Sequence, residues 1–403
     1  MASALTHRVA SLCSLGTSRS VPTSRKLTEP FQFRPCNFTL TPVKCASLSI
    51  SNPAGSFTWD DVEHVSQPEF SWDDRSDLGG FRERIKLCNR GNEFVSEFLP
   101  FVVGAEVVGY IHNGFTKHLK DFEDVFVFPR DGSYESGFGY HVGLSPSLRT
   151  PEDKTKAVAR VVECLGDALI PGIRNELYPV KSSFGSSIVF SLERAAAPYF
   201  GIKAYGVHMN GYVERDGEKL LWIGKRSREK STFPGMLDHL VAGGLPHDVA
   251  CGENVMKECE EEAGIPRTIS SRWLTALLMS MNYEVHSFCW LFTVAFAPNQ
   301  FRAIPVGAVS YMDIDGYRFK RDVLFCYDLK LPEDFIPINQ DGEVESFKLV
   351  PVPQVANIIR RTNFFKSNCS LVIIDFLFRH GYIKPEYDGY LDLLWSLKCG
   401  DCS

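Results

Sequence analysis

The spacing of apolar positions changes along the chain and predicts a succession of strands and helices. In region 60–200, the apolar runs 102–111 and 125–128 predict strands, since glycine interrupts the first and proline ends the second. Pro151 then opens a predicted helix, because apolar side chains recur at helical spacing as far as Leu169. This region is expected to be a small α+β accessory domain.

Region 201–350 alternates more regularly between apolar and polar positions. The turn residues Asp216 and Gly217 separate two of its apolar runs, as expected of a hairpin. Strands are predicted at 204–213, 220–224, 287–297, 323–331 and 347–350, and a helix at 250–263. Residues 351–403 form a helical extension. The expected fold class is α/β, with a mixed sheet covered by helices.

Composition adds a leader segment and narrows the class of partner. The 403 residues are 44% hydrophobic and 23% charged, and the net charge is −6. Residues 1–59 carry six basic residues, one acid and 17 Ser or Thr, a composition typical of a chloroplast transit peptide. Their charge of +5 leaves −11 on residues 60–403, which argues against nucleic-acid binding. No apolar run approaches the ~20 residues of a membrane-spanning helix.

The cysteines and histidines show no metal-binding spacing. Twelve cysteines, mostly single, are typical of free thiols in a reducing compartment. Cys399 and Cys402 have a two-residue spacing but no second pair, so zinc is not expected there. For His208, His239 and His247 we expect packing or surface roles.

Three glutamates near residue 260 form the most informative pattern. Gly264 and the proline after Ile265 predict the end of a helix, so Glu258, Glu261 and Glu262 occupy its last two turns on one face. Like charges at this spacing repel, and the helix dipole disfavours acids at this end. A divalent cation would reverse both effects, and carboxylate oxygens suit Mg²⁺ or Mn²⁺. The pattern predicts a metal site, and a solvated acidic helix end is its alternative.

The full spacing resembles the Nudix box, Gly-x5-Glu-x7-Arg-Glu-U-x-Glu-Glu-x-Gly-U, where U is a large apolar residue. Gly243, Glu258, Glu261, Glu262 and the final pair of Gly264 and Ile265 stand at matching positions. The resemblance implies a Nudix α/β/α sandwich, and it implies that the three glutamates are catalytic residues that coordinate divalent cations.

Two positions depart from the box. Lys257 replaces its arginine, which keeps the charge but not the forked geometry. Val249 replaces its first glutamate, so that carboxylate is missing from its usual place.

Flanking segments make the resemblance more specific. They include Arg174 to Val180, Trp222 to Ser227, and Phe233 to Asp238. Over about 70–400 the chain resembles plant chloroplast Nudix hydrolases, whose N-terminal domain also occurs in fungal fusions with thiamine pyrophosphokinase. This implies hydrolysis of a small-molecule diphosphate, with damaged (oxo or oxy) thiamine diphosphate cut to its monophosphate. Oxidised nucleotides such as 8-oxo-dGTP and other nucleoside diphosphate derivatives are the alternative substrates.

Further side chains are candidates for binding and catalysis. Arg226 and Lys230 are predicted diphosphate binders, with surface charge as the alternative. Asp238 binds a polar ring substituent or caps a turn. Glu343 or Glu345, which precede the predicted strand at 347, could act as general base, and a solvated loop acid is the alternative for either.

Two other readings stay open at this point. The segment from Arg226 to Asp238 also resembles isopentenyl diphosphate isomerase. That enzyme requires a cysteine near this segment, and none lies near it in this sequence. The valine at position 249 leaves room for a non-catalytic binding module. The sequence leaves the oligomeric state open.

Overall fold

The computed structural model describes residues 56–68, 76–129, 139–247, 249–267 and 302–400. Most of the predicted leader, the predicted strand at 287–297 and Cys402 lie outside the described residues. No helix within the described ranges has the length and apolar character needed to cross a membrane.

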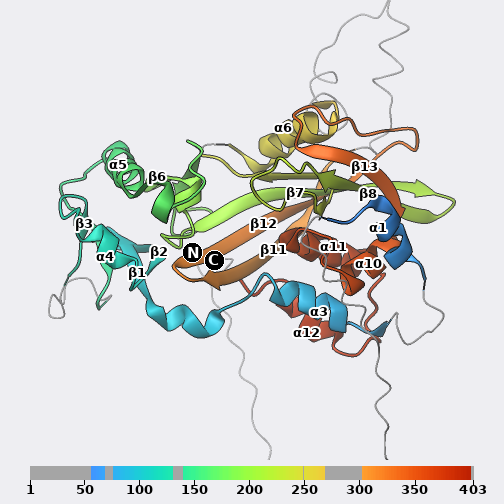
Figure 1. Ribbon diagram of the computed structural model, residues 1–403, viewed down its shortest axis with the longest axis horizontal. Coiled ribbons are helices and arrows are strands. Elements are labelled where there is room, and N and C mark those ends of the chain that lie inside the picture. Colours follow the sequence, from blue (N-terminus) through green and yellow to red (C-terminus); the bar gives the residue numbers. More distant parts are fainter. Residues whose placement is uncertain (1–55, 69–75, 130–138, 248, 268–301, 401–403) are drawn as a thin grey trace, which may run out of the picture. The chain divides into compact units, whose positions relative to one another are not determined.

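A mixed sheet forms the centre of the second half of the chain (Figure 1). Its main strand order is β11-β12-β7-β8-β13, β10 pairs with β7, and β9 pairs with β8. Only β12 and β7 run parallel; the other pairs are antiparallel. The strands are β7 (Lys203–Arg215), β8 (Glu218–Arg226), β9 (Leu237–Asp238), β10 (Val241–Gly244), β11 (Ile304–Asp315), β12 (Arg318–Lys330) and β13 (Val344–Pro351).

Alternate residues of β7 face the two covering layers of helices. Val207 and Met209 pack against Val255 and Cys259 of α6 (Cys251–Ala263). On the other face, the Tyr212 ring contacts Phe376 of α11 (Ser367–Arg379). Figure 1 shows α6 and α11 on opposite sides of the sheet. The α/β/α sandwich expected from the sequence is therefore present.

The α11 layer joins the two ends of the described chain. It contains α10 (Val352–Arg361), α12 (Tyr390–Ser396), α1 (Trp59–Ser66) and α3 (Gly79–Lys86). Phe57 is 2% exposed and its ring stacks on Phe364 at 4.0 Å between centroids. Phe81 of α3 packs in the same cluster. Residues 57–66 and 78–88 thus pack with the helical extension, although the sequence places 57–59 in the leader and the rest in the accessory domain.

The accessory region has its own sheet and core. Its sheet has the order β2-β1-β4-β3, and β5 and β6 form a separate pair. Its core joins Phe101, Phe190 and Phe200 to Val158 of α5. The predicted helix and strands are present, and Gly104 supplies a positive φ of 65° at the β1–β2 turn. The elements are η1 (Asn92–Glu97), β1 (Phe98–Val103), β2 (Glu106–His112), α4 (Thr116–Leu119), β3 (Phe126–Val127), β4 (Val142–Leu144), α5 (Pro151–Leu169), β5 (Leu177–Val180), β6 (Phe190–Glu193) and η2 (Arg194–Ala196).

The packing of Phe57 generates a stability prediction. Phe57→Ala should lower the free energy of unfolding by about 3–5 kcal/mol, because it removes a fully buried ring. Phe94→Ala is the matched control, since Phe94 is 47% exposed. Urea unfolding of both variants measures the effect. Equal losses in the two variants would show that residue 57 is not part of the core.

Candidate functional site

The glutamate helix ends where the sequence predicts. Gly264 has a φ of 63°, and the Ile265 N–H donates to the Cys259 carbonyl at 2.9 Å, which closes the last turn. Val255, Cys259 and Ala263 face the sheet. The three glutamates of the motif therefore lie outside this apolar face of the helix.

Glu262 is buried beside β10, the short strand that precedes α6. Its exposed fraction is 7%, and its Oε2 accepts a hydrogen bond from the Ala242 N–H at 2.8 Å. Burial raises the pKa of Glu262 well above its usual value, and the charges of Asp238, Glu258 and Glu343 raise it further, although the Ala242 N–H opposes this. When this carboxylate is ionised, a positively charged partner is needed to stabilise its charge.

Glu258 lies against the backbone of the same segment. A Cβ placed on Gly243 would fall 2.4 Å from the Glu258 Cδ, so a larger residue at this position would displace the Glu258 carboxylate. Burial raises the pKa of Glu258, and Glu261 and Glu343 add to the shift, whereas Lys257 opposes it. The opening glycine of the motif therefore has a direct steric role at the carboxylate cluster.

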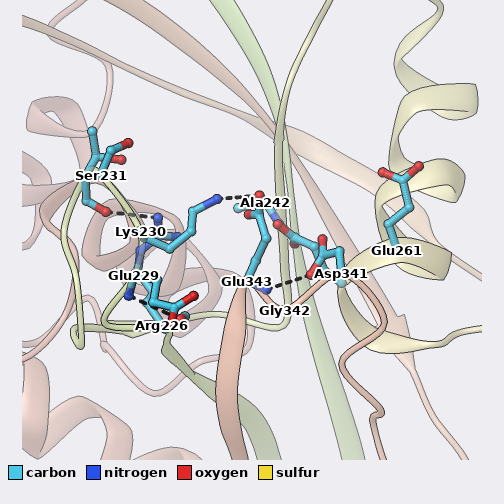
Figure 2. Close-up of polar contacts among 12 residues, drawn as sticks. Arg226, Glu229, Lys230, Ser231, Ala242, Glu261, Asp341, Gly342 and Glu343 are labelled. Carbon is cyan, nitrogen blue, oxygen red and sulfur yellow. Dashed lines mark hydrogen bonds and ion pairs between the residues drawn. The ribbon is translucent and has the colours of Figure 1, made fainter. Parts of the chain in front are cut away.

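Glu261 takes a different position from the other two. Its side chain is 47% exposed and its Oε2 lies 3.0 Å from the Lys257 Nζ. Figure 2 shows Glu261 on α6, apart from the contacts around Glu343. The structure brings Glu258 and Glu262 together and leaves Glu261 at the solvent side of the cluster.

Glu343 approaches the motif glutamates from the start of β13, the edge strand that pairs with β8. It precedes β13, and its carboxylate forms an ion pair with the Lys230 ammonium (Figure 2). Glu343 is near enough to raise the pKa of both Glu258 and Glu262. Glu345, in contrast, faces Lys225 at 3.7 Å. Of the two predicted general-base candidates, only Glu343 acts electrostatically on the motif glutamates.

Arg226 is bound on all sides by protein groups. Its Nη1 donates to the Asp238 Oδ2 at 2.9 Å, and its Nε and Nη2 donate to the carbonyls of Phe233 and Thr232, each at 3.1 Å. Arg226 thus fixes the loop between β8 and β9. This arrangement supports a positioning role for an arginine that the sequence suggests as a diphosphate binder.

Asp238 is a buried centre of charge rather than a turn cap at the surface. Burial would raise its pKa, but Lys366, His239 and Arg226 together hold the pKa of Asp238 well below its usual value. The Lys366 Nζ lies 3.4 Å from its Oδ2, and the Cys369 Sγ lies 2.6 Å from its Oδ1. Sequence reasoning missed Lys366 and Cys369, because they are separated from Asp238 by 128 and 131 residues.

Comparison with known proteins gives relatives over nearly the whole chain. "Nudix hydrolase 20, chloroplastic" of Arabidopsis thaliana is 56% identical over 94% of both chains. "Nudix hydrolase 24, chloroplastic" of the same plant is 53% identical over 97% of this chain and 99% of its own length. Residues 80–204 match a family model described as a domain of unknown function, DUF4743. The Nudix domain of Shewanella oneidensis NrtR, solved with ADP ribose, aligns at 13% identity and a TM-score of 0.30 over 45% of this chain and 90% of that chain.

The contacts of Arg226 generate a second stability prediction. Arg226→Gln should lower the free energy of unfolding by about 3–5 kcal/mol, because it leaves part of a buried ion pair uncompensated. Lys230→Gln is the control and should cost at most about 1 kcal/mol, since the Lys230–Glu343 pair is partly exposed. Urea unfolding distinguishes the two. A loss for Arg226→Gln no greater than for Lys230→Gln would contradict the positioning role.

Proposed function

Because this chain belongs to the Nudix hydrolase family, we propose that it hydrolyses a small-molecule diphosphate at the carboxylate cluster formed by α6 and the start of β13. Its relatives are chloroplastic, so it is a chloroplast hydrolase of pyrophosphate bonds that uses a divalent metal ion, as the family does. The burial of Glu258 and Glu262 side by side is the observation that carries the assignment of the site.

The donor set at this cluster fits a hard divalent cation. Glu258 and Glu262 supply carboxylate oxygens from a partly dehydrated position, and the charge of Glu258 disfavours the ionised form of Glu262. We assign Mg²⁺ or Mn²⁺ to these two residues, with Glu261 at the outer side. When bound, the ion would neutralise charge on the phosphoryl oxygens and lower the pKa of a bound water.

The neighbouring residues supply the remaining chemistry. Glu343 is the proposed general base that takes a proton from the attacking water, since it lies within electrostatic reach of both buried glutamates. Its partner Lys230 is the proposed diphosphate contact, because an ammonium that pairs with Glu343 in the free protein can pair with a phosphate instead. Asp238 and Arg226 act behind them by fixing the 227–236 loop.

For the substrate we propose a damaged oxo or oxy form of thiamine diphosphate, which would be cut to its monophosphate. The resemblance of the two-domain arrangement to proteins fused with thiamine pyrophosphokinase supports this choice. The DUF4743 match at residues 80–204 lies ahead of the Nudix motif, and we assign it to the N-terminal domain of that arrangement. Oxidised nucleotides are the competing substrate class.

A substrate panel tests the proposal. The full chain with Mg²⁺ should convert oxythiamine diphosphate to its monophosphate faster than it converts 8-oxo-dGTP or unmodified nucleoside diphosphates to theirs. The monophosphate product is measured for every substrate, together with phosphate from the diphosphates and pyrophosphate from 8-oxo-dGTP. Good turnover of a nucleotide without turnover of oxythiamine diphosphate would overturn the substrate assignment. Conversion of isopentenyl diphosphate to its isomer would overturn the hydrolase assignment.

Matched glutamine variants locate the activity within the molecule. Glu262→Gln should reduce kcat by about 10²-fold or more, since metal-ion charge stabilisation is worth several kcal/mol. Glu260→Gln on the same helix is the control, because Glu260 pairs with Arg267 at 2.8 Å, outside the cluster. Equal activity of the two variants would place the chemistry elsewhere, and binding of diphosphates without hydrolysis of any would support a binding module.

A further inference from the structure

Three buried metal-binding side chains from separate elements meet on the α11 side of the sheet. They are His208 of β7, His239 between β9 and β10, and Cys369 of α11, with exposed fractions of 4%, 3% and 0%. One ligand atom of each lies within 4.8 Å of those of the other two. The His208 Nδ1 and the His239 Nε2 are 2.9 Å apart. These three residues are far apart in the sequence, and the folding of the chain brings them together.

The Asp238 carboxylate lies beside this group. Its Oδ1 contacts the group, and its Oδ2 pairs with the nearby side-chain cations. Its Oδ1 lies 2.6 Å from the Cys369 Sγ and 3.6 Å from the His239 Nδ1. Its Oδ2 lies 2.9 Å from the Arg226 Nη1 and 3.4 Å from the Lys366 Nζ. The two oxygens of one carboxylate therefore serve different partners, and Oδ1 faces the histidines and the thiol.

One polar atom of this group has no hydrogen-bond partner within the described part of the protein. This atom is the buried His239 Nδ1. Leaving a buried polar atom unpaired costs about 1–3 kcal/mol.

We propose that His208, His239 and Cys369 bind one zinc ion, and that His239 binds through the Nε2 that faces the His208 Nδ1. Two imidazoles and a thiolate are donors that zinc prefers. Zinc–ligand bonds of about 2.0–2.3 Å place tetrahedral ligands about 3.3–3.8 Å apart, so ligand atoms that now lie within 4.8 Å of one another have to shift by up to about 1 Å on binding. The thiol proton leaves to solvent on binding, and the thiolate together with the neighbouring Asp238 carboxylate balances the charge of the ion.

This proposed zinc site has a structural role and is distinct from the carboxylate cluster on α6. It would fasten the N-terminal end of α11 to β7 and to the β9–β10 segment, where Lys366 and Arg226 meet Asp238. Its nitrogen and sulfur donors select a softer ion than the oxygen donors of Glu258 and Glu262. Two different metals can therefore occupy the same domain.

Metal analysis of the intact wild-type chain tests the zinc site. Protein produced with added zinc and dialysed against buffer should retain about one zinc per chain. After replacement by Co²⁺, it should show the ligand-field bands of tetrahedral cobalt and a thiolate-to-cobalt charge-transfer band. A carboxylate site cannot give that charge-transfer band. Absence of both retained zinc and the charge-transfer band would overturn the proposal.

Two serine variants identify the thiolate. Cys369→Ser should lose the retained zinc and the charge-transfer band, because a hydroxyl is a poor zinc ligand. Cys326→Ser is the matched control, since Cys326 is also 0% exposed but lies outside the group and contacts the Leu324 carbonyl. Retention of zinc and of the band by Cys369→Ser would overturn the assignment. If Cys369→Ser does not fold, the cobalt spectrum of the wild type alone decides.

Discussion

The burial of two carboxylates at the end of α6 is the constraint on which the site depends. Glu258 and Glu262 are one helical turn apart, Glu262 is buried and Glu258 is partly buried, and both lie where the helix dipole disfavours negative charge. The surrounding sequence is arranged to allow this. Gly243 leaves room for Glu258, Gly264 ends the helix two residues after Glu262, and Lys257 and Lys230 place ammonium groups beside neighbouring acids. In the proposed function, a divalent cation would supply the positive charge that these local contacts lack.

The sheet separates two kinds of polar cluster. On the α6 side the donors are carboxylate oxygens, with Glu262 buried and Glu261 at the solvent side, and such oxygens suit a hard divalent cation. On the α11 side the donors are imidazole and thiol groups in a closed interior. Asp238 links the two sides, since it pairs with Arg226 of the loop that carries Lys230 and also contacts Cys369. Asp238 thereby connects the buried cluster to the loop that we propose to contact the substrate.

The sequence predicts features that arise from local spacing. The alternation in 204–213 and 323–331 identifies β7 and β12, and the glycine at 264 identifies the end of α6. Pairings between distant segments leave no such signal. The helix at 59–66 packs on residues near 357 through tertiary contacts, and Lys230 meets Glu343 because β13 pairs with β8. The spacing of His208 and His239 predicts no metal site, since the strand pairing of β10 with β7 is what places them side by side.

Thermal unfolding of the wild type and Glu262→Gln, with and without Mg²⁺ or Mn²⁺, tests the central claim most directly. Without divalent ions, Glu262→Gln should have the higher Tm, because an amide keeps an acceptor for the Ala242 N–H and removes a buried charge. At about 100 times the Kd, the cation should stabilise the wild type by about 2.7 kcal/mol and the variant much less. A lower Tm for the metal-free variant, together with equal stabilisation of both proteins by the cation, would contradict the account.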